Sequence, residues 1–128
     1  MSPTASAAAR GIRFTIHNDT PVVPMNPLLS VWAAVNRRST SDQVIGAEQA
    51  VSPVQALRAT TIDAAYQNFE EDSKGSIEVG KLADFTLLSK NPLKVNELHI
   101  RDIRVLMTIV GEETVYRANH HRKRMLLD

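Results

Sequence analysis

The residues of this sequence best suited to chemistry are His17, Asn18 and Asp19, a polar cluster between a short alternating segment and a proline-rich loop. Catalytic groups of parallel α/β barrels gather at the C-terminal ends of the strands. An aspartate in that place can bind a divalent metal or accept a proton from metal-bound water. Judged locally, an Asx-turn or a helix cap is the simpler interpretation, because Asn and Asp readily bond to nearby backbone.

The other histidines do not form a recognisable metal-binding pattern. Neither His-x-His nor His-Glu-x-x-His occurs in the chain. His120 and His121 are neighbours, so in a helix or strand they would point apart, and we interpret them as part of a solvated basic tail. We place His99 in a polar connection. The chain contains no cysteine, which excludes disulfides, thiolate zinc sites and cysteine nucleophiles.

The elements that position the polar cluster can be inferred from periodicity and capping. Alternation of Ile12, Phe14 and Ile16 predicts a strand over residues 11–16. Prolines at 21, 24 and 27 then force a shaped loop. Asn26 can cap a helix with Pro27 in its first position. This helix would end near Arg37 and carry an apolar stripe formed by Leu28, Val31, Trp32 and Val35.

A second helix start is strongly marked at Ser52, where Pro53 and Gln55 complete a capping-box pattern. Its expected stripe runs over one long helix through Val54, Leu57, Thr61, Ala65 and Phe69. Downstream, the period changes to two, which predicts strands over 76–79, 82–88, 103–110 and 114–116. Gly111 and Glu112 fit a two-residue hairpin turn between the last two strands.

Composition bounds the class of protein. The chain has 128 residues, of which 43% are apolar and 23% charged, the mix of a soluble globular domain. A net charge of +1 gives no argument for a nucleic-acid partner. No run approaches the roughly 18 apolar residues that a membrane span needs. The Ala-rich start does not resemble a signal peptide, so we expect a cytoplasmic protein without a membrane partner.

Three segments resemble the C-terminal part of the amidohydrolase superfamily, in the amidohydrolase 3 branch with its YtcJ-like and AepA-like members. They are residues 11–22, 52–66 and 74–85, which look like the eighth barrel strand with its loop, the following helix and the return into a small β domain. The resemblance implies an α/β fold. The chain would contain the last strand and helices of a metal-dependent hydrolase TIM barrel, plus strands of the composite β-sandwich domain.

The implied organisation has four parts. Residues 1–10 would be a flexible, disordered or weakly helical lead-in. Residues 11–69 would hold the last barrel strand, the active-site loop and the helices. Residues 70–117 would form the β strands of the composite domain, and residues 118–128 a basic tail. We expect Arg37, in a family-like stretch at a helix end, to have a structural role.

The resemblance also implies a chemistry. Asp19 would be the strand-eight aspartate that contacts a divalent metal, zinc in the intact family, and moves a proton during hydrolysis of a small amide or N-acyl substrate. His17 would line the substrate pocket. However, a barrel of this kind needs roughly 250 residues, and catalytic zinc normally takes three protein ligands. We therefore expect a C-terminal segment that binds no metal stably and is inactive alone.

Two alternatives remain open from the sequence. The chain could be a non-catalytic binding or subunit-like module derived from an amidohydrolase. It could also associate with itself, or with a complementary barrel fragment, and so cover apolar faces that a whole barrel would bury.

Overall fold

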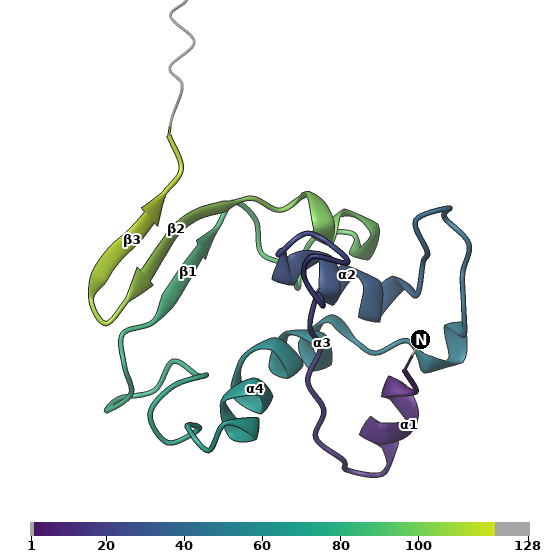
Figure 1. Cartoon of the computed structure of the whole chain (residues 1–128), viewed down its shortest axis with the longest axis horizontal. Coiled ribbons are helices and arrows are strands. Elements are labelled where there is room, and N and C mark those ends of the chain that lie inside the picture. The colour runs from purple at the N-terminus through teal and green to yellow at the C-terminus, as the bar shows by residue number, and fades with distance from the viewer. Residues whose placement is uncertain (1, 120–128) are drawn as a thin grey trace, which may run out of the picture.

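The computed structural model describes residues 2–119 (Figure 1). His120, His121 and the rest of the expected basic tail beyond Asn119 lie outside the described residues. The elements follow in the order α1 (Thr4–Ala9), α2 (Pro27–Asn36), the 3₁₀ helix η1 (Ala47–Gln49), α3 (Pro53–Thr60), α4 (Ile62–Gln67), β1 (Phe85–Leu88), the 3₁₀ helix η2 (Glu97–Asp102), β2 (Val105–Val110) and β3 (Glu113–Arg117).

Helix α2 forms the centre of the core, as its sequence predicts. The Asn26 side chain accepts a hydrogen bond from the Leu28 N–H at 3.1 Å, which caps the helix next to Pro27. The expected apolar stripe is buried, and it packs in one cluster with residues from three other parts of the chain. Those partners are Val51, Ala56, Ile100 and Ile103. The Trp32 indole also donates to the Leu98 carbonyl at 3.0 Å, which ties η2 to α2.

The helix that begins at Ser52 is shorter than predicted. The capping box of Ser52 and Gln55 is present, but the helix breaks at Thr61 into α3 and α4. The hydroxyls of Thr60 and Thr61 both donate to the Leu57 carbonyl, at 2.9 and 2.8 Å, and such bonds compete with the backbone ladder. The predicted stripe is right only in part: Ala65 is buried and Leu57 packs against the core, but Val54 and Phe69 are exposed. Ala56 and Ala59, which lie outside the predicted stripe, are fully buried.

The β strands form one antiparallel sheet in the order β1-β2-β3. Phe85 pairs with Ile109 and Leu87 with Met107, so these four side chains share one face of the sheet. Gly111 and Glu112, both with positive φ, make the predicted two-residue turn between β2 and β3. Three of the predicted strands therefore exist, over narrower ranges than expected for the first two.

Two other predicted strands do not form, and residues 11–16 and 76–79 have no regular strand structure. A strand requires a hydrogen-bonded neighbour, and the described residues supply none to either segment. Phe14 and Ile16 nevertheless pack against the core, so the alternation of residues 11–16 reflects burial on one side. Ile77 and Val79 are exposed in the loop that joins α4 to β1.

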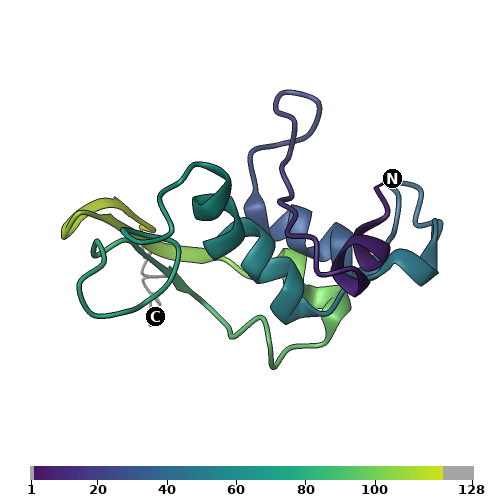
Figure 2. The same cartoon turned by 90° about the horizontal axis from the view of Figure 1, so that it is seen from below.

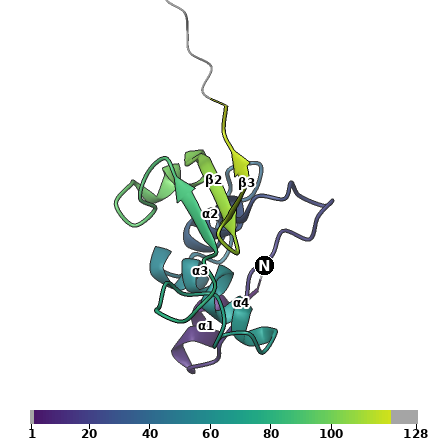
Figure 3. The ribbon, with the colours of Figure 1, turned by 90° about the vertical axis from the view of Figure 1, so that its left-hand side faces the viewer.

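The segment expected as a flexible lead-in contains α1. Thr4 is buried and its hydroxyl donates to the Gln49 carbonyl at 2.7 Å, which holds α1 against η1. The sheet lies at one end of the molecule and α1 with η1 at the other, with α2 and α3 between them (Figure 1). An end-on view places α1, α3 and α4 on one side of the sheet (Figure 3). The loop between α1 and α2 projects away from this body (Figure 2).

Candidate functional site

Asp19 belongs to the loop between α1 and α2 and is exposed to solvent. Figure 2 shows this loop projecting from the body of the molecule. The Asp19 φ of 52° places the backbone in the left-handed region, which Asp tolerates better than most residues. The backbone is held on both sides: its N–H donates to His17 Nδ1 at 3.1 Å, and its carbonyl accepts from the Val22 N–H at 2.8 Å. Within residues 2–119, the Asp19 carboxylate has no hydrogen-bond or ion-pair partner of its own.

The local roles that the sequence left open for Asp19 belong to other residues. Asn26, not Asp19, caps α2. The Asn18 amide donates to the Asn26 carbonyl at 3.0 Å and so joins the two ends of the loop. The Asp19 side chain is therefore not needed for an Asx-turn or a cap, and its two oxygens remain available to a ligand or to water.

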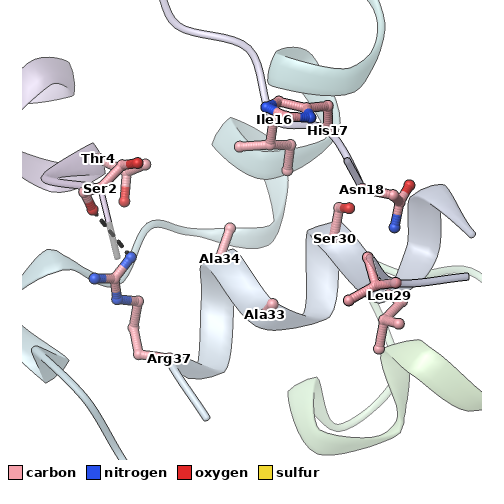
Figure 4. Close-up of a pocket in the computed structure, with 11 residues that line it drawn as sticks. Ser2, Thr4, Ile16, His17, Asn18, Leu29, Ser30, Ala33, Ala34 and Arg37 are labelled. Atoms are coloured by element: carbon pink, nitrogen blue, oxygen red, sulfur yellow. Dashed lines mark hydrogen bonds between the residues drawn. The ribbon is translucent and has the colours of Figure 1, made fainter. Parts of the chain in front are cut away.

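His17 is exposed, and its ring is oriented by the loop that carries Asp19. Nδ1 accepts the Asp19 N–H, so a neutral ring carries its proton on Nε2. His17 also lines a hollow of about 280 Å³, which lies between the loop and α2 (Figure 4). The hollow is lined by Ser2, Thr4, Ile16, His17, Asn18, Val23, Leu29, Ser30, Ala33, Ala34 and Arg37. Asp19 itself is not among these residues.

Arg37 ends α2 and is buried, with only 5% of its surface exposed. Its backbone takes the left-handed conformation of a helix C-cap, with φ of 54°. Its Nε donates to the Ile45 carbonyl at 3.3 Å and its Nη1 to the Ser2 carbonyl at 3.1 Å. The expected structural role is confirmed: Arg37 ties the N-terminal segment and the loop after α2 to the end of the helix.

Ser30 and Ala33 were not singled out from the sequence, although they line the hollow. A signal for them is visible in retrospect. Ser30, Ala33 and Arg37 recur at spacings of three and four along α2, on the side opposite the buried apolar stripe. This spacing predicts that the three residues share one face of the helix. It does not predict the hollow, because the other walls come from the N-terminal segment and the loop before α2.

The described residues do not assemble a metal centre. Across residues 2–119, no group of three His, Asp or Glu side chains lies close enough to hold a metal ion. His99, in η2, instead pairs with Asp102 at 3.0 Å on an exposed surface. His17 and Asp19 thus offer at most two donors, fewer than the three protein ligands of a typical catalytic zinc.

Comparison with known proteins identifies the family. The model of the amidohydrolase family matches residues 1–116, so the chain belongs to this family. Two curated relatives carry hydrolase names. The chain is 31% identical over 110 residues to the N-substituted formamide deformylase of Arthrobacter pascens, which covers 86% of this chain and 20% of the relative. It is 28% identical over 111 residues to the putative amidohydrolase YtcJ of Bacillus subtilis, which covers 84% and 21%.

A third relative is plant Protein LONG AFTER FAR-RED 3 of Arabidopsis thaliana, 37% identical over 100 residues, or 77% of this chain and 17% of that protein. The fold matches the crystal structure of an amidohydrolase from Thermotoga maritima with a TM-score of 0.69 and 22% identity, over 90% of this chain and 26% of that one. The chain thus spans about a fifth of the length of the curated relatives. Within the described residues, no helix is both long and apolar enough to cross a membrane.

Proposed function

We propose that this chain supplies the eighth-strand end of an amidohydrolase active site, with Asp19 as the carboxylate that transfers protons during hydrolysis of a carbon–nitrogen bond other than a peptide bond. The observation that carries the proposal is the unpartnered Asp19 carboxylate, presented on a projecting loop within a chain that matches the amidohydrolase family over residues 1–116. The proposal includes two structural assignments. Residues 11–16, which form no strand in this structure, would become the last barrel strand where a neighbouring strand accepts their hydrogen bonds. Strands β1, β2 and β3 would belong to the composite β-sandwich domain.

The role of Asp19 follows from the reaction. Hydrolysis of an amide or N-acyl group adds water across the C–N bond, so one proton leaves the attacking water and one reaches the departing nitrogen. A positioned carboxylate can accept the first and deliver it as the second. Asp19 suits this task because no other group occupies its oxygens, and because His17 and Val22 hold its backbone on both sides. His17 would contact the substrate through Nε2–H.

The described residues do not fit a divalent metal by themselves, as the absence of a three-donor group among residues 2–119 shows. A zinc or similar ion of the intact family would need ligands from another polypeptide segment. The proposal therefore assigns Asp19 only the proton transfer. It also assigns the isolated 128-residue chain no hydrolytic activity, since the pocket and its loops require more chain than the fifth of the relatives that it spans.

The sharpest test is a hybrid enzyme. The matching stretch of the N-substituted formamide deformylase is replaced by this chain, and hydrolysis of an N-substituted formamide is measured. Because general acid–base catalysis contributes about 10²- to 10⁴-fold, Asp19→Asn should lower kcat of the hybrid at least about a hundredfold. Asp42→Asn is the matched control, since Asp42 is also exposed and has a φ of 62°.

Two results would contradict the proposal. One is a folded, active hybrid whose kcat is the same with Asp19→Asn as with Asp42→Asn. The other concerns the chain alone: metal-dependent turnover by the isolated protein that disappears in Asp19→Asn would show that it needs no further segment.

A second candidate function is a non-catalytic binding or subunit-like module. The observation that favours it is the chain's own hydrophobic cluster, in which α2 packs with η2 and α3. Such a core would allow the chain to fold without a barrel. Two findings together would favour this module. The chain would be a stable, monodisperse monomer, and no neighbouring reading frame would encode His-x-His and further strands. An adjacent frame of that kind would favour a complementary barrel fragment as partner.

A further inference from the structure

The free edge of β1 lacks the protection that sheet edges normally carry. Strand β1 forms one edge of the three-stranded sheet and β3 forms the other (Figure 1). Edge strands are commonly protected against other chains by charged side chains, proline or a bulge. The strand Phe85–Leu88 contains none of these, and its pairing with β2 skips a residue only on β2, at Leu106. Phe85, Thr86 and Leu87 are all exposed.

Strand β3, by contrast, is protected at the other edge of the sheet. Its pairing with β2 skips Val115, so the bulge lies in the edge strand itself. Its first and last residues, Glu113 and Arg117, are charged and exposed. A strand that added to this sheet would therefore pair with β1 rather than with β3.

The backbone of β1 has hydrogen-bonding groups that point away from β2. On one side of the strand, the Ala83 carbonyl accepts an N–H from the turn between β2 and β3 at 3.4 Å. On the other side, the Ser89 N–H donates at 2.9 Å to the carbonyl that immediately precedes β2. Alternate residues of an antiparallel strand bond to the same neighbour, so the N–H and carbonyl groups of Thr86 and Leu88 point outward. Within residues 2–119, no backbone hydrogen bond from another part of the fold reaches these two residues.

The charges that flank β1 favour a second copy of the chain as the added strand. In an antiparallel pair of β1 strands centred on Leu87, Thr86 of each copy lies opposite Leu88 of the other, so the outward backbone groups face one another. The same register brings Asp84 of one copy to Lys90 of the other, at both ends of the symmetric pair. Both side chains are exposed, and neither takes part in the ion pairs among residues 2–119.

Neighbouring registers lack this charge match. With the pair centred on Thr86, Asp84 would lie opposite Leu88. With the pair centred on Leu88, it would lie opposite Pro92. One Asp84 oxygen accepts the Gly111 N–H at 2.9 Å, which holds the carboxylate at the end of β1. Because opposite charges across neighbouring strands stabilise their pairing and like charges destabilise it, the register centred on Leu87 is favoured.

We propose that two copies of this chain associate through β1, so that their three-stranded sheets join into one antiparallel sheet in the register centred on Leu87. The two Leu87 side chains meet on the same face and partly cover one another. A single short strand buries little surface, so we expect weak association that needs a high protein concentration. Strand β1 lies outside the loop that carries Asp19, so this inference holds or fails separately from the proton-transfer role.

Single cysteines measure the register, because the chain has no cysteine of its own. In the proposed register, the Leu87 Cα atoms of the two copies lie about 4.5 Å apart, a distance that a disulfide spans. The Thr86 Cα atoms lie roughly 7–8 Å apart, which is too far. Under mild oxidation, Leu87→Cys should form a disulfide-linked dimer at least about tenfold faster than Thr86→Cys, as measured on non-reducing gels. Equal rates, or a faster reaction of Thr86→Cys, would overturn the proposal.

A charge reversal tests the contact between Asp84 and Lys90. Lys90→Glu should raise the dissociation constant of the dimer at least about fivefold, because each Asp84 then faces a like charge. Lys94→Glu is the matched control, since Lys94 is also exposed but lies in the turn after the paired residues. Sedimentation equilibrium of the full chain gives each constant. Equal effects of the two reversals, or a parent chain that stays monomeric at every concentration, would overturn the proposal.

Discussion

Lys81 organises the loop that joins α4 to β1. Its Nζ contacts the Glu78 carboxylate at 2.9 Å and the Ser76 hydroxyl at 2.7 Å, and it also donates to the Glu71 carbonyl. Much of this loop falls within residues 74–85, one of the three stretches that resemble the family. Its polar residues thus hold a turn together, and in the structure they bond to one another rather than to the Asp19 loop.

These contacts lower the pKa of Glu78, first through the hydrogen bond from Ser76 and then through the hydrogen bond and charge of Lys81. A carboxyl whose pKa is lower in the folded chain stabilises the fold above its unfolded pKa, and this contribution is lost as pH falls through the folded pKa. Lys81→Met should therefore raise the pKa of Glu78 toward its ordinary value of 4.5, as measured by a ¹³C NMR titration of the glutamate carboxyls.

Lys74→Met is the control, since Lys74 pairs with Glu70 at 3.0 Å, whereas the ion-pair partner of Glu78 is Lys81. It should leave the titration of Glu78 unchanged. If Glu78 titrated identically in the parent chain and in Lys81→Met, Lys81 would have no influence on this carboxyl. The contact between Lys81 and Glu78 would then be absent in solution.

At the scale of elements, the close approach of the loop to α4 depends on Gly75. A Cβ at this position would lie 2.7 Å from the Ala65 Cβ and 2.9 Å from the Ile62 Cα, and the residue has a φ of +89°. Gly80 has a similar φ of +94°, but a Cβ there would meet nothing within 4 Å. Comparing substitutions at these two glycines therefore separates the cost of a steric clash from the cost of the left-handed backbone conformation.

Gly80→Ala should lower the free energy of unfolding by about 1–2 kcal/mol, the cost of placing an L-residue in the left-handed region. Gly75→Ala should cost about 1–3 kcal/mol more, because α4 or the loop must also shift. Urea denaturation of both variants measures the difference. Equal losses in the two variants would mean that the loop does not pack closely against α4.

At the scale of the molecule, one face of the sheet is apolar and open to solvent. Phe85, Leu87, Met107 and Ile109 share this face through their cross-strand pairing. Leu87 is 54% exposed and Phe85 is 40% exposed. A three-stranded sheet normally needs a covered apolar face to be stable. Self-association, one of the alternatives that the sequence leaves open, would cover this face.

Leu87→Lys should shift the isolated chain toward monomer, because a charge on this face resists burial against another apolar surface. Thr86→Lys is the matched control, since its side chain lies on the opposite face of the same strand. Light scattering at a series of concentrations gives the mass of each variant. A parent chain that stays monomeric at every concentration would rule out self-association.

The local features of the fold were predictable because neighbouring residues determine them. Asn26 and Ser52 cap helices through bonds to backbone two or three residues away, and the turn at Gly111 and Glu112 needs only positive φ at both positions. The projecting loop was likewise visible in its prolines. Asp19 was found in the same way, as a polar residue at the end of an alternating segment.

The failed predictions concern features that need partners from elsewhere in the chain. Residues 11–16 and 76–79 alternate as strands do, but a strand forms only where another strand accepts its hydrogen bonds. The stripe expected between Val54 and Phe69 was right only for Leu57 and Ala65, because the helix breaks at Thr61 and Ala56 and Ala59 also face the core. Periodicity shows that a segment has two different sides, but not which side becomes buried.

The sequence by itself determined the family resemblance, the caps and the choice of Asp19 as the candidate site residue, since each depends on residue types in short stretches. Only the tertiary structure decided that Asp19 makes no cap, that His17 Nδ1 accepts the Asp19 N–H, and that Arg37 is buried beside a hollow. The physical reason is the same in each case. Burial and hydrogen-bond partnership depend on segments distant in sequence, such as Ser2 and Ile45 around Arg37.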